Sequence, residues 1–353
     1  MSLIRFTTEK CTERKDMEKR TIDEKIQFWS PADELVSLIQ AVGWTNPHSH
    51  LDRAFTITPA TLHLANAPLQ AKWDLVDAVK LEAKNDPGIL YTRMATAVEY
   101  MISQGVHTVG SFIDIDPVIE EVAIDVAEKI RDDFKGDIEM VYVNQTLKGV
   151  LNPVAREWFD RGAARVDIIG GLPGKDVGRE AEHLDIVLGT AKSQGKMAHV
   201  HTDQNNRPDE RETQLLVEKT VEHGMQGRTV AVHAISTAAQ PAEYRENLYK
   251  EMEKAGVMVI SCPIAFIDSK RNETLAPTHN SITPVDEMTK AGIVVGMGTD
   301  NIQDLYLPLS KGNMGEEILQ LARTLRWFDL PALVDIATKN GRIVLGLPEY
   351  TRQ

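Results

Sequence analysis

Short apolar runs rich in β-branched residues alternate with amphipathic stretches of helical period through most of the chain. The runs that we expect to form strands are residues 42–48, 107–113, 138–144, 165–169, 197–201, 229–233, 257–261 and 293–299. Stretches expected to form helices include 117–134, 179–193, 210–223, 242–255, 281–291, 315–326 and 331–345. Repeated strand-then-helix units predict a parallel sheet, because each parallel connection needs a long crossover.

Eight such units over roughly 250–300 residues favour a closed (β/α)8 TIM-type barrel within an α/β fold class. The alternative is an open doubly wound sheet. Its usual sign, a glycine-rich turn directly after the first strand, is missing from this sequence. The periodic pattern therefore predicts a barrel.

The regular pattern begins only after a charge-rich N-terminal segment. We expect residues 1–40 to form a charged helical extension, in which Ser30 caps a helix and Pro31 occupies its first turn. Residues 41–353 are expected to form the barrel. No low-complexity linker or internal repeat marks a further domain, and no β-sandwich domain is evident.

Charge and composition limit the classes of partner. The chain has 39 Lys and Arg against 52 Asp and Glu, a formal charge of −13, which argues against binding to nucleic acid or to an anionic membrane surface. Its only two cysteines, Cys11 and Cys262, are far apart, so a disulfide scaffold or a cysteine-based zinc site is not expected. No signal peptide or membrane-spanning run is visible. We expect a cytoplasmic protein that binds a small molecule and leave open a homo-oligomer.

Histidine and aspartate residues follow several of the predicted strands at their carboxyl ends. His48 and His50 lie two residues apart, so in an extended chain their imidazoles point to the same face. His201, His233 and Asp300 end three other predicted strands. In a (β/α)8 barrel these ends meet on the rim that carries the active site. The pattern indicates a metal site, which requires three or four protein ligands.

Each of these residues alone has an ordinary structural explanation. His201 is as compatible with a hydrogen-bonded core histidine as with a metal ligand, and Asp300 could simply cap a turn. His199 shares a strand face with His201 but lies one layer deeper, so we assign it a structural role. The convergence of five groups on one rim favours the metal site over these separate explanations.

The arrangement of these residues resembles the signature of the amidohydrolase superfamily. More specifically, the chain resembles the branch that contains bacterial cytosine deaminase and N-isopropylammelide isopropylaminohydrolase, from about residue 45 to about residue 326. The resemblance rests on 48–52 (His-Ser-His-Leu-Asp), 143–149 (Val-Asn-Gln-Thr-Leu-Lys-Gly), 300–309 (Asp-Asn-Ile-Gln-Asp-Leu-Tyr-Leu-Pro-Leu) and 312–314 (Gly-Asn-Met).

The resemblance implies a cofactor and a set of site residues. One divalent metal ion, zinc or iron, would be held by the side chains of His48, His50, His201 and Asp300. No lysine ends the fourth predicted strand, so the carbamylated bridge of binuclear relatives has no obvious source and a mononuclear site is favoured. The further roles fall on His233 beside the water or substrate, and on Gln145, Arg53 and Asn301 as substrate-binding residues.

Three positions depart from the pattern of that branch. Cytosine deaminase has a glutamate three residues after the strand-five histidine, where this chain has Gln204, and a glutamine cannot carry a proton. Phe112 replaces a histidine that is often found on strand two. Branch members also carry a small β-sandwich built from both termini, for which this chain shows no pattern.

We therefore predict a metal-dependent hydrolase that cleaves a C–N bond of a small heterocycle or related amide through a metal-activated water. Asp300 would move the proton, with help from Asp203, and His233 would stabilise the oxyanion. One alternative is lactam or lactone opening on the same scaffold. The other is a metal-binding barrel with weak turnover, because Gln204 stands in place of a catalytic glutamate.

Overall fold

The computed structural model describes residues 29–267 and 282–349, and their parallel strands form two hydrogen-bonded groups in chain order. The strands are Trp44–Asn46 (β1), Val106–Asp114 (β2), Glu139–Gln145 (β3), Ile169–Gly171 (β4), Ala198–Thr202 (β5), Thr229–His233 (β6), Met258–Ser261 (β7) and Val295–Met297 (β8). Strands β1 to β3 form one group and β4 to β8 the other.

Backbone bridges join the two groups at both seams. Val143 pairs with Ile168 between β3 and β4, and Ser49 pairs with Asp300 just beyond β1 and β8. At the second seam the Asp300 amide also donates to the His48 carbonyl at 3.0 Å. The eight strands thus follow one another around a closed ring, which confirms the predicted (β/α)8 barrel.

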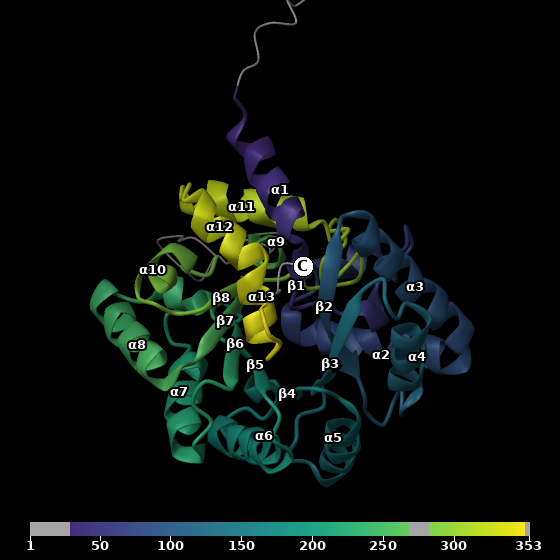
Figure 1. Ribbon diagram of the computed structural model, residues 1–353. Helices are drawn as coiled ribbons and strands as arrows, with labels where there is room; N and C mark the ends of the chain where they lie inside the picture. The colour runs from purple at the N-terminus through teal and green to yellow at the C-terminus, as the bar shows by residue number, and fades with distance from the viewer. Residues whose placement is uncertain (1–28, 268–281, 350–353) are drawn as a thin grey trace, which may run out of the picture.

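Helices surround the ring of strands (Figure 1). They are Pro31–Val42 (α1), Leu69–Asn85 (α2), Pro87–Ser103 (α3), Val122–Asp133 (α4), Pro153–Arg165 (α5), Glu180–Gln194 (α6), Glu212–His223 (α7), Ala242–Ala255 (α8), Pro263–Ile267 (α9), Val285–Lys290 (α10), Met314–Leu325 (α11), Leu330–Ala337 (α12) and Lys339–Val344 (α13). Helix α1 starts as expected, because Ser30 Oγ accepts a hydrogen bond from the Asp33 amide and Pro31 occupies the first turn.

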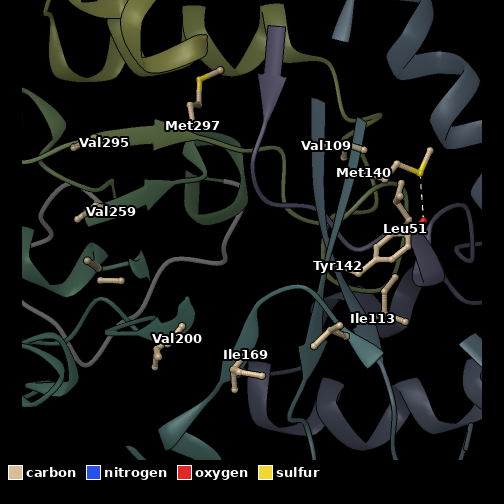
Figure 2. Close-up of a cluster of buried hydrophobic side chains, with 14 of the residues drawn as sticks. Leu51, Val109, Ile113, Met140, Tyr142, Ile169, Val200, Val259, Val295 and Met297 are labelled. Carbon is tan, nitrogen blue, oxygen red and sulfur yellow. Dashed lines mark hydrogen bonds between the residues drawn. The ribbon is translucent and has the colours of Figure 1, made fainter. Parts of the chain in front are cut away.

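The strands separate two apolar layers. Side chains that point into the barrel form one buried cluster, including Phe112, Val141, Val143, Ile168, Val230, Val232 and Ile260. Alternate residues point outward and pack with the helices; Figure 2 shows Ile169, Val200, Val259 and Val295 of this outer layer, on strands β4, β5, β7 and β8. This period-two alternation fixes which strand residues can reach the barrel axis.

The end of the barrel opposite the predicted active site is filled by α13. Val344 and Leu345 belong to the interior apolar cluster. The Val344 carbonyl lies 2.7 Å from His199 Nε2, within hydrogen-bonding distance. This contact supports the structural role that we assigned to His199.

Helix α2 lies on the other side, over loops that follow the strands. Its buried Trp73 and Val76 form a small apolar cluster with Leu147 after β3 and Leu172 after β4, and Tyr306 packs against the same cluster. The helix therefore covers part of the rim where the predicted site residues lie.

Several element boundaries differ from the sequence-based expectation. The predicted strand 165–169 is wrong over its first three residues, because Arg165 ends α5 and makes ion pairs with Asp125 and Glu128 on α4. Only Ile168, in its bridge to Val143, and Ile169 pair with neighbouring strands. The predicted helix 331–345 is divided into α12 and α13 at Thr338. Helices α2, α3 and α5 were not predicted.

Residues 1–28 of the expected N-terminal extension, and Ser281 of the expected helix 281–291, lie outside the described residues. Within 29–267 and 282–349, no helix combines the length and the apolar character that crossing a membrane requires.

Candidate metal centre and active site

The segment that carries His48 and His50 is held between strands β8 and β2. On one side Asn46 Nδ2 donates to Thr299 Oγ1 at 2.9 Å, and the Thr299 amide donates to the His48 carbonyl at 3.1 Å. On the other side Ser49 Oγ donates to the Gly110 carbonyl at 2.9 Å. The two imidazoles are thus fixed against neighbours on both sides, although the segment itself is not a regular strand.

The predicted ligands meet in space. The ligand atoms of His48, His50 and His201 all lie within 4.8 Å of one another, and so do those of His48, His233 and Asp300. All five residues are buried. The structure therefore brings the five predicted side chains together from four separate parts of the chain.

The two carboxylate oxygens of Asp300 face different imidazoles. Oδ1 lies 3.1 Å from His50 Nε2 and 3.4 Å from His48 Nε2. Oδ2 lies 4.0 Å from His233 Nε2. One oxygen is therefore directed to the candidate ligand histidines and the other to the histidine after β6.

Burial keeps the imidazoles of His50, His201 and His233 neutral, and the Asp300 carboxylate stays ionised. Burial lowers the pKa of His201 well below its usual range and that of His233 to about 3. Burial and then the Arg53 guanidinium lower the pKa of His50. Burial would raise the pKa of Asp300, but its contacts with His48 and His50 hold that pKa well below the usual range. Neutral imidazole and carboxylate are the forms that bind a divalent metal.

His48 carries the clearest evidence that these residues fit a metal ion. Its side chain is fully buried, yet among the described residues neither ring nitrogen has a hydrogen-bond partner, and His201 Nδ1 also has none. A buried polar atom without a partner is costly and rare in a native protein. Coordination of a metal through one nitrogen of each ring would satisfy that nitrogen, and the three-imidazole, one-carboxylate set suits zinc or iron.

The backbone is left-handed at the ends of β6 and β8. His233 has a φ of 78° and Asp300 a φ of 58°. Such conformations cost about 1–3 kcal/mol in a non-glycine residue and cluster at functional sites. The left-handed turn swings each side chain away from the regular strand direction, toward the other ligands.

The residues predicted to bind substrate lie around this cluster. Gln145 ends β3 and is buried, and its Oε1 accepts from the Thr146 amide at 2.9 Å. The Arg53 guanidinium contacts His50 Nδ1. Asn301 is buried and its side-chain amide donates to Asp304.

Asp203 and Gln204, the two residues after β5 with predicted catalytic roles, differ in their surroundings. The Asp203 carboxylate accepts hydrogen bonds from the Glu212 and Thr213 amides at the start of α7, while Glu212 Oε2 accepts from the Asp203 amide at 2.9 Å. Burial raises the pKa of Asp203 to about 6. Gln204 is half-buried in the loop that follows. Catalytic roles for Asp203 and Gln204 stay predictions.

Comparison with known proteins identifies the family. Residues 41–351 match the model of the amidohydrolase family. The chain belongs to that family. This amidohydrolase is 52% identical over 255 residues to an uncharacterised protein of Haemophilus influenzae, covering 71% of the chain and 92% of the relative. It is 22% identical to N-isopropylammelide isopropyl amidohydrolase of Pseudomonas sp. strain ADP, covering 86% of the chain and 74% of the relative.

A solved structure supports the fold. The amidohydrolase matches 5-methylcytosine deaminase from Klebsiella pneumoniae, liganded with 5-fluorocytosine, with a TM-score of 0.78 at 22% identity over 86% of this chain and 74% of that one. Together the family and these likenesses confirm a metal-dependent hydrolase that acts on C–N bonds other than peptide bonds. Lactam or lactone opening and a metal-binding barrel with weak turnover are not favoured.

The structure also places residues at the amidohydrolase site that the sequence analysis did not assign. The ring of Phe112, noted only as a departure, packs against His48 and His201 with centroid distances of 4.9 and 4.6 Å. Asp114, two residues further along β2, was missed, and so was Lys80 of α2. Asp114 is the last residue of β2. Its position at the carboxyl end of a strand could have identified it as a site residue.

Proposed function

We propose that this amidohydrolase binds one divalent ion, zinc or iron, through His48, His50, His201 and Asp300, and hydrolyses an exocyclic C–N bond of a small nitrogen heterocycle. The acidic charge of the chain supports a small-molecule substrate rather than nucleic acid, and its two distant cysteines suit the cytoplasm. A single ion is supported by β4, in which Ile169, Gly170 and Gly171 offer no lysine to bridge a second one.

The observation that carries the proposal is that the two carboxylate oxygens of Asp300 face different histidines. Oδ1 lies among the ligand histidines, 3.1 Å from His50 Nε2, whereas Oδ2 lies 4.0 Å from His233 Nε2. A carboxylate placed in this way can act as a ligand through one oxygen. It can hold a proton on the other, next to an imidazole that faces the same space.

When bound, the divalent ion would lower the pKa of a coordinated water and so make hydroxide available near neutral pH. Asp300 Oδ2 would take up a proton from the nucleophile and return it to the departing amine. His233 Nε2 lies where it can donate a hydrogen bond to the oxygen that develops negative charge. Burial of all these groups excludes bulk water and strengthens each of these interactions.

Gln145 supports a ring substrate. Its side chain is uncharged and offers both a donor and an acceptor, which is the complement of an amide edge in a heterocycle. Gln145 is also paired in register with Asp114 on β2, so it lies on the rim that carries the metal cluster.

Gln204 limits the choice of substrate. Protonation of a ring nitrogen needs an acid at this position, and the nearest carboxylate in the chain, Asp203, is engaged by the α7 amides. Hydrolysis that protonates only the leaving amine can proceed with Asp300 alone. We therefore propose poor deamination of cytosine and a better substrate among rings whose exocyclic amine leaves directly.

The test is a turnover screen of the metal-loaded protein on aminated pyrimidines, triazines and lactams, with release of ammonia or amine as the readout. We expect cytosine to be a poor substrate and Gln204→Glu to raise its turnover. General acid–base catalysis is typically worth ~100 to 10,000-fold, so a partial gain is measurable. Efficient cytosine turnover by the natural protein would show that Gln204 does not limit this reaction, and no C–N hydrolysis of any compound would refute the proposed function.

A further inference from the structure

A group of buried charged side chains lies beside the metal cluster, on the side of β1, β2 and α2. Its members are Asp52, Arg53, Lys80, Asp114, Asp116 and Asp304. The Lys80 ammonium binds the Asp116 carboxylate and lies 3.4 Å from Asp114 Oδ2. Four carboxyl groups thus share two cations in a region with almost no access to solvent. Buried charges that are not fully paired are costly, so a function for this group is expected.

Asp114 points into the barrel toward its rim. Successive residues of a strand alternate in direction, so Asp114 shares the face of Phe112, whose ring packs against His48 and His201. Register pairs Phe112 with Val143 and Asp114 with Gln145. Asp114 and Gln145 therefore form the layer directly above the interior apolar cluster, side by side at the candidate site.

Within the part of the chain that the structure describes, several complementary polar atoms of this region have no hydrogen-bond partner. Asp114 is 2% exposed and Arg53 is 3% exposed. Neither carboxylate oxygen of Asp114 has a hydrogen bond, nor has Arg53 Nε or the Tyr306 hydroxyl. The Arg53 guanidinium lies over the Tyr306 ring at 5.1 Å from its centroid. Buried donors and acceptors that lie in one region without bonding each other are typical of a site that a third group completes.

We propose that Asp114, Arg53 and Tyr306 form a subsite that holds the ring of the substrate. The Asp114 carboxylate accepts a hydrogen bond from a ring N–H, while Arg53 Nε and the Tyr306 hydroxyl donate to an adjacent ring oxygen. The subsite thus selects an uncharged ring with a lactam edge, in which N–H and C=O are neighbours. This inference rests on the proposed function and names the substrate group that the site reads.

The subsite also indicates which substrate group Arg53 binds. An arginine can bind either a carboxylate or a ring carbonyl. Here Asp114 belongs to the same buried group as Arg53, because the Asp114 amide donates to the carboxylate of the adjacent Asp52 at 2.7 Å. A substrate carboxylate would be repelled by Asp114, whereas an N–H next to a carbonyl satisfies both residues. Asp114 is therefore a specificity-determining residue that excludes carboxylated rings.

The competing explanation is that Asp114 only balances the charge of Lys80. Two variants separate the explanations. Asp114→Asn removes the anion but keeps the shape of the side chain. Asp116→Asn removes the other carboxylate that shares Lys80, so a purely structural charge imbalance would weaken ring binding in both variants. If Asp114 binds the substrate, Asp116→Asn still has the acceptor and binds the ring as the wild type does.

The experiment is calorimetric titration of metal-loaded protein with uracil, 5,6-dihydrouracil and cytosine, with the N-methylated forms of uracil, and with 6-carboxyuracil. We expect at least one of the uncharged rings to bind, methylation of one N–H to weaken binding by roughly tenfold or more, and the carboxylated ring to bind least. Asp114→Asn should weaken the N–H ring by roughly 10–100-fold and remove the penalty for methylation. Asp116→Asn should bind the rings as the wild type does.

Any of four results would overturn the proposal: no ring binds the wild-type protein, methylation of either nitrogen has no effect, Asp114→Asn binds as the wild type does, or Asp116→Asn weakens ring binding as much as Asp114→Asn does. If Asp114→Asn does not fold, the methylated rings still test the wild-type protein, and Tyr306→Phe should lose roughly tenfold in affinity for the carbonyl-bearing rings.

Failure here is distinct from failure of the proposed function, which is read from amine release. If the wild type releases amine and Asp114→Asn binds the rings as tightly as the wild type does, only the proposed subsite is refuted. If the rings bind as expected but no compound of the screen is hydrolysed, only the proposed reaction is refuted.

Discussion

Gly298→Ala should release the metal without changing any ligand. Gly298 lies where β8 leaves the sheet, and a Cβ atom there would stand 2.7 Å from both the Cβ and the carbonyl oxygen of His48. Ordinary contacts begin at 3.4 Å, so the two segments would have to separate by about 0.7 Å. Functional constellations tolerate roughly 0.5 Å, and disturbing the support of a metal ligand typically costs ~10–100-fold in metal affinity.

The assay is competition for zinc against a chelator of known affinity, with elemental analysis of the purified protein. Gly189→Ala on α6 is the matched control, because the nearest atom to its added Cβ is 3.9 Å away and alanine favours a helix. We expect the control to bind metal as the wild type does. Wild-type metal affinity in Gly298→Ala, with an unchanged melting temperature, would refute the claim that the contact between β8 and His48 sets the site.

Three further changes probe the ligands, the substrate and the buried charges. His201→Ala should lose metal and activity together, which elemental analysis and amine release would show; retained stoichiometric metal would remove His201 from the ligands. Gln145→Ala should weaken ground-state and transition-state binding by roughly 1–3 kcal/mol, the usual cost of an unmade buried hydrogen bond, and unchanged kinetics would exclude Gln145 from the site. Lys80→Met leaves Asp114 and Asp116 without their cation and should cost about 3–5 kcal/mol, or about 4–7 °C in melting temperature for a chain of this length. An unchanged melting temperature would show that the ion pair is not needed for stability.

The metal-ligand cluster could be predicted because each of its residues is marked by the few residues that precede it in the sequence. His48, His50, His201, His233 and Asp300 all follow apolar runs, and parallel strands in a barrel bring their carboxyl ends to one rim. The sequence pattern therefore fixes both the identity of the side chains and the place where they meet.

The left-handed backbone at His233 and Asp300 was not visible in the same pattern, because aspartate and histidine adopt this conformation more often than most residues but in only a minority of cases, so their presence alone does not indicate it.

The group of buried charged side chains that includes Lys80 could not be predicted from the local sequence pattern. Lys80 lies between Val79 and Leu81 and looks like one of many lysines on an exposed helix face. It is buried only because α2, which connects β1 and β2, packs over the rim. The boundary of β4 was misplaced for a related reason, since Arg165 is held at the end of α5 by acidic residues of a neighbouring helix. Both features depend on tertiary contacts.

The central claim is that one ion, held by three histidines and one aspartate, serves the hydrolysis of a C–N bond. The most direct test adds zinc or ferrous iron stepwise to metal-free protein while amine release from the best substrate of the screen is recorded. The account predicts that the rate rises linearly to one equivalent of metal per chain and then stays constant. A rise that continues to two equivalents, or a full rate with no metal added, would contradict it.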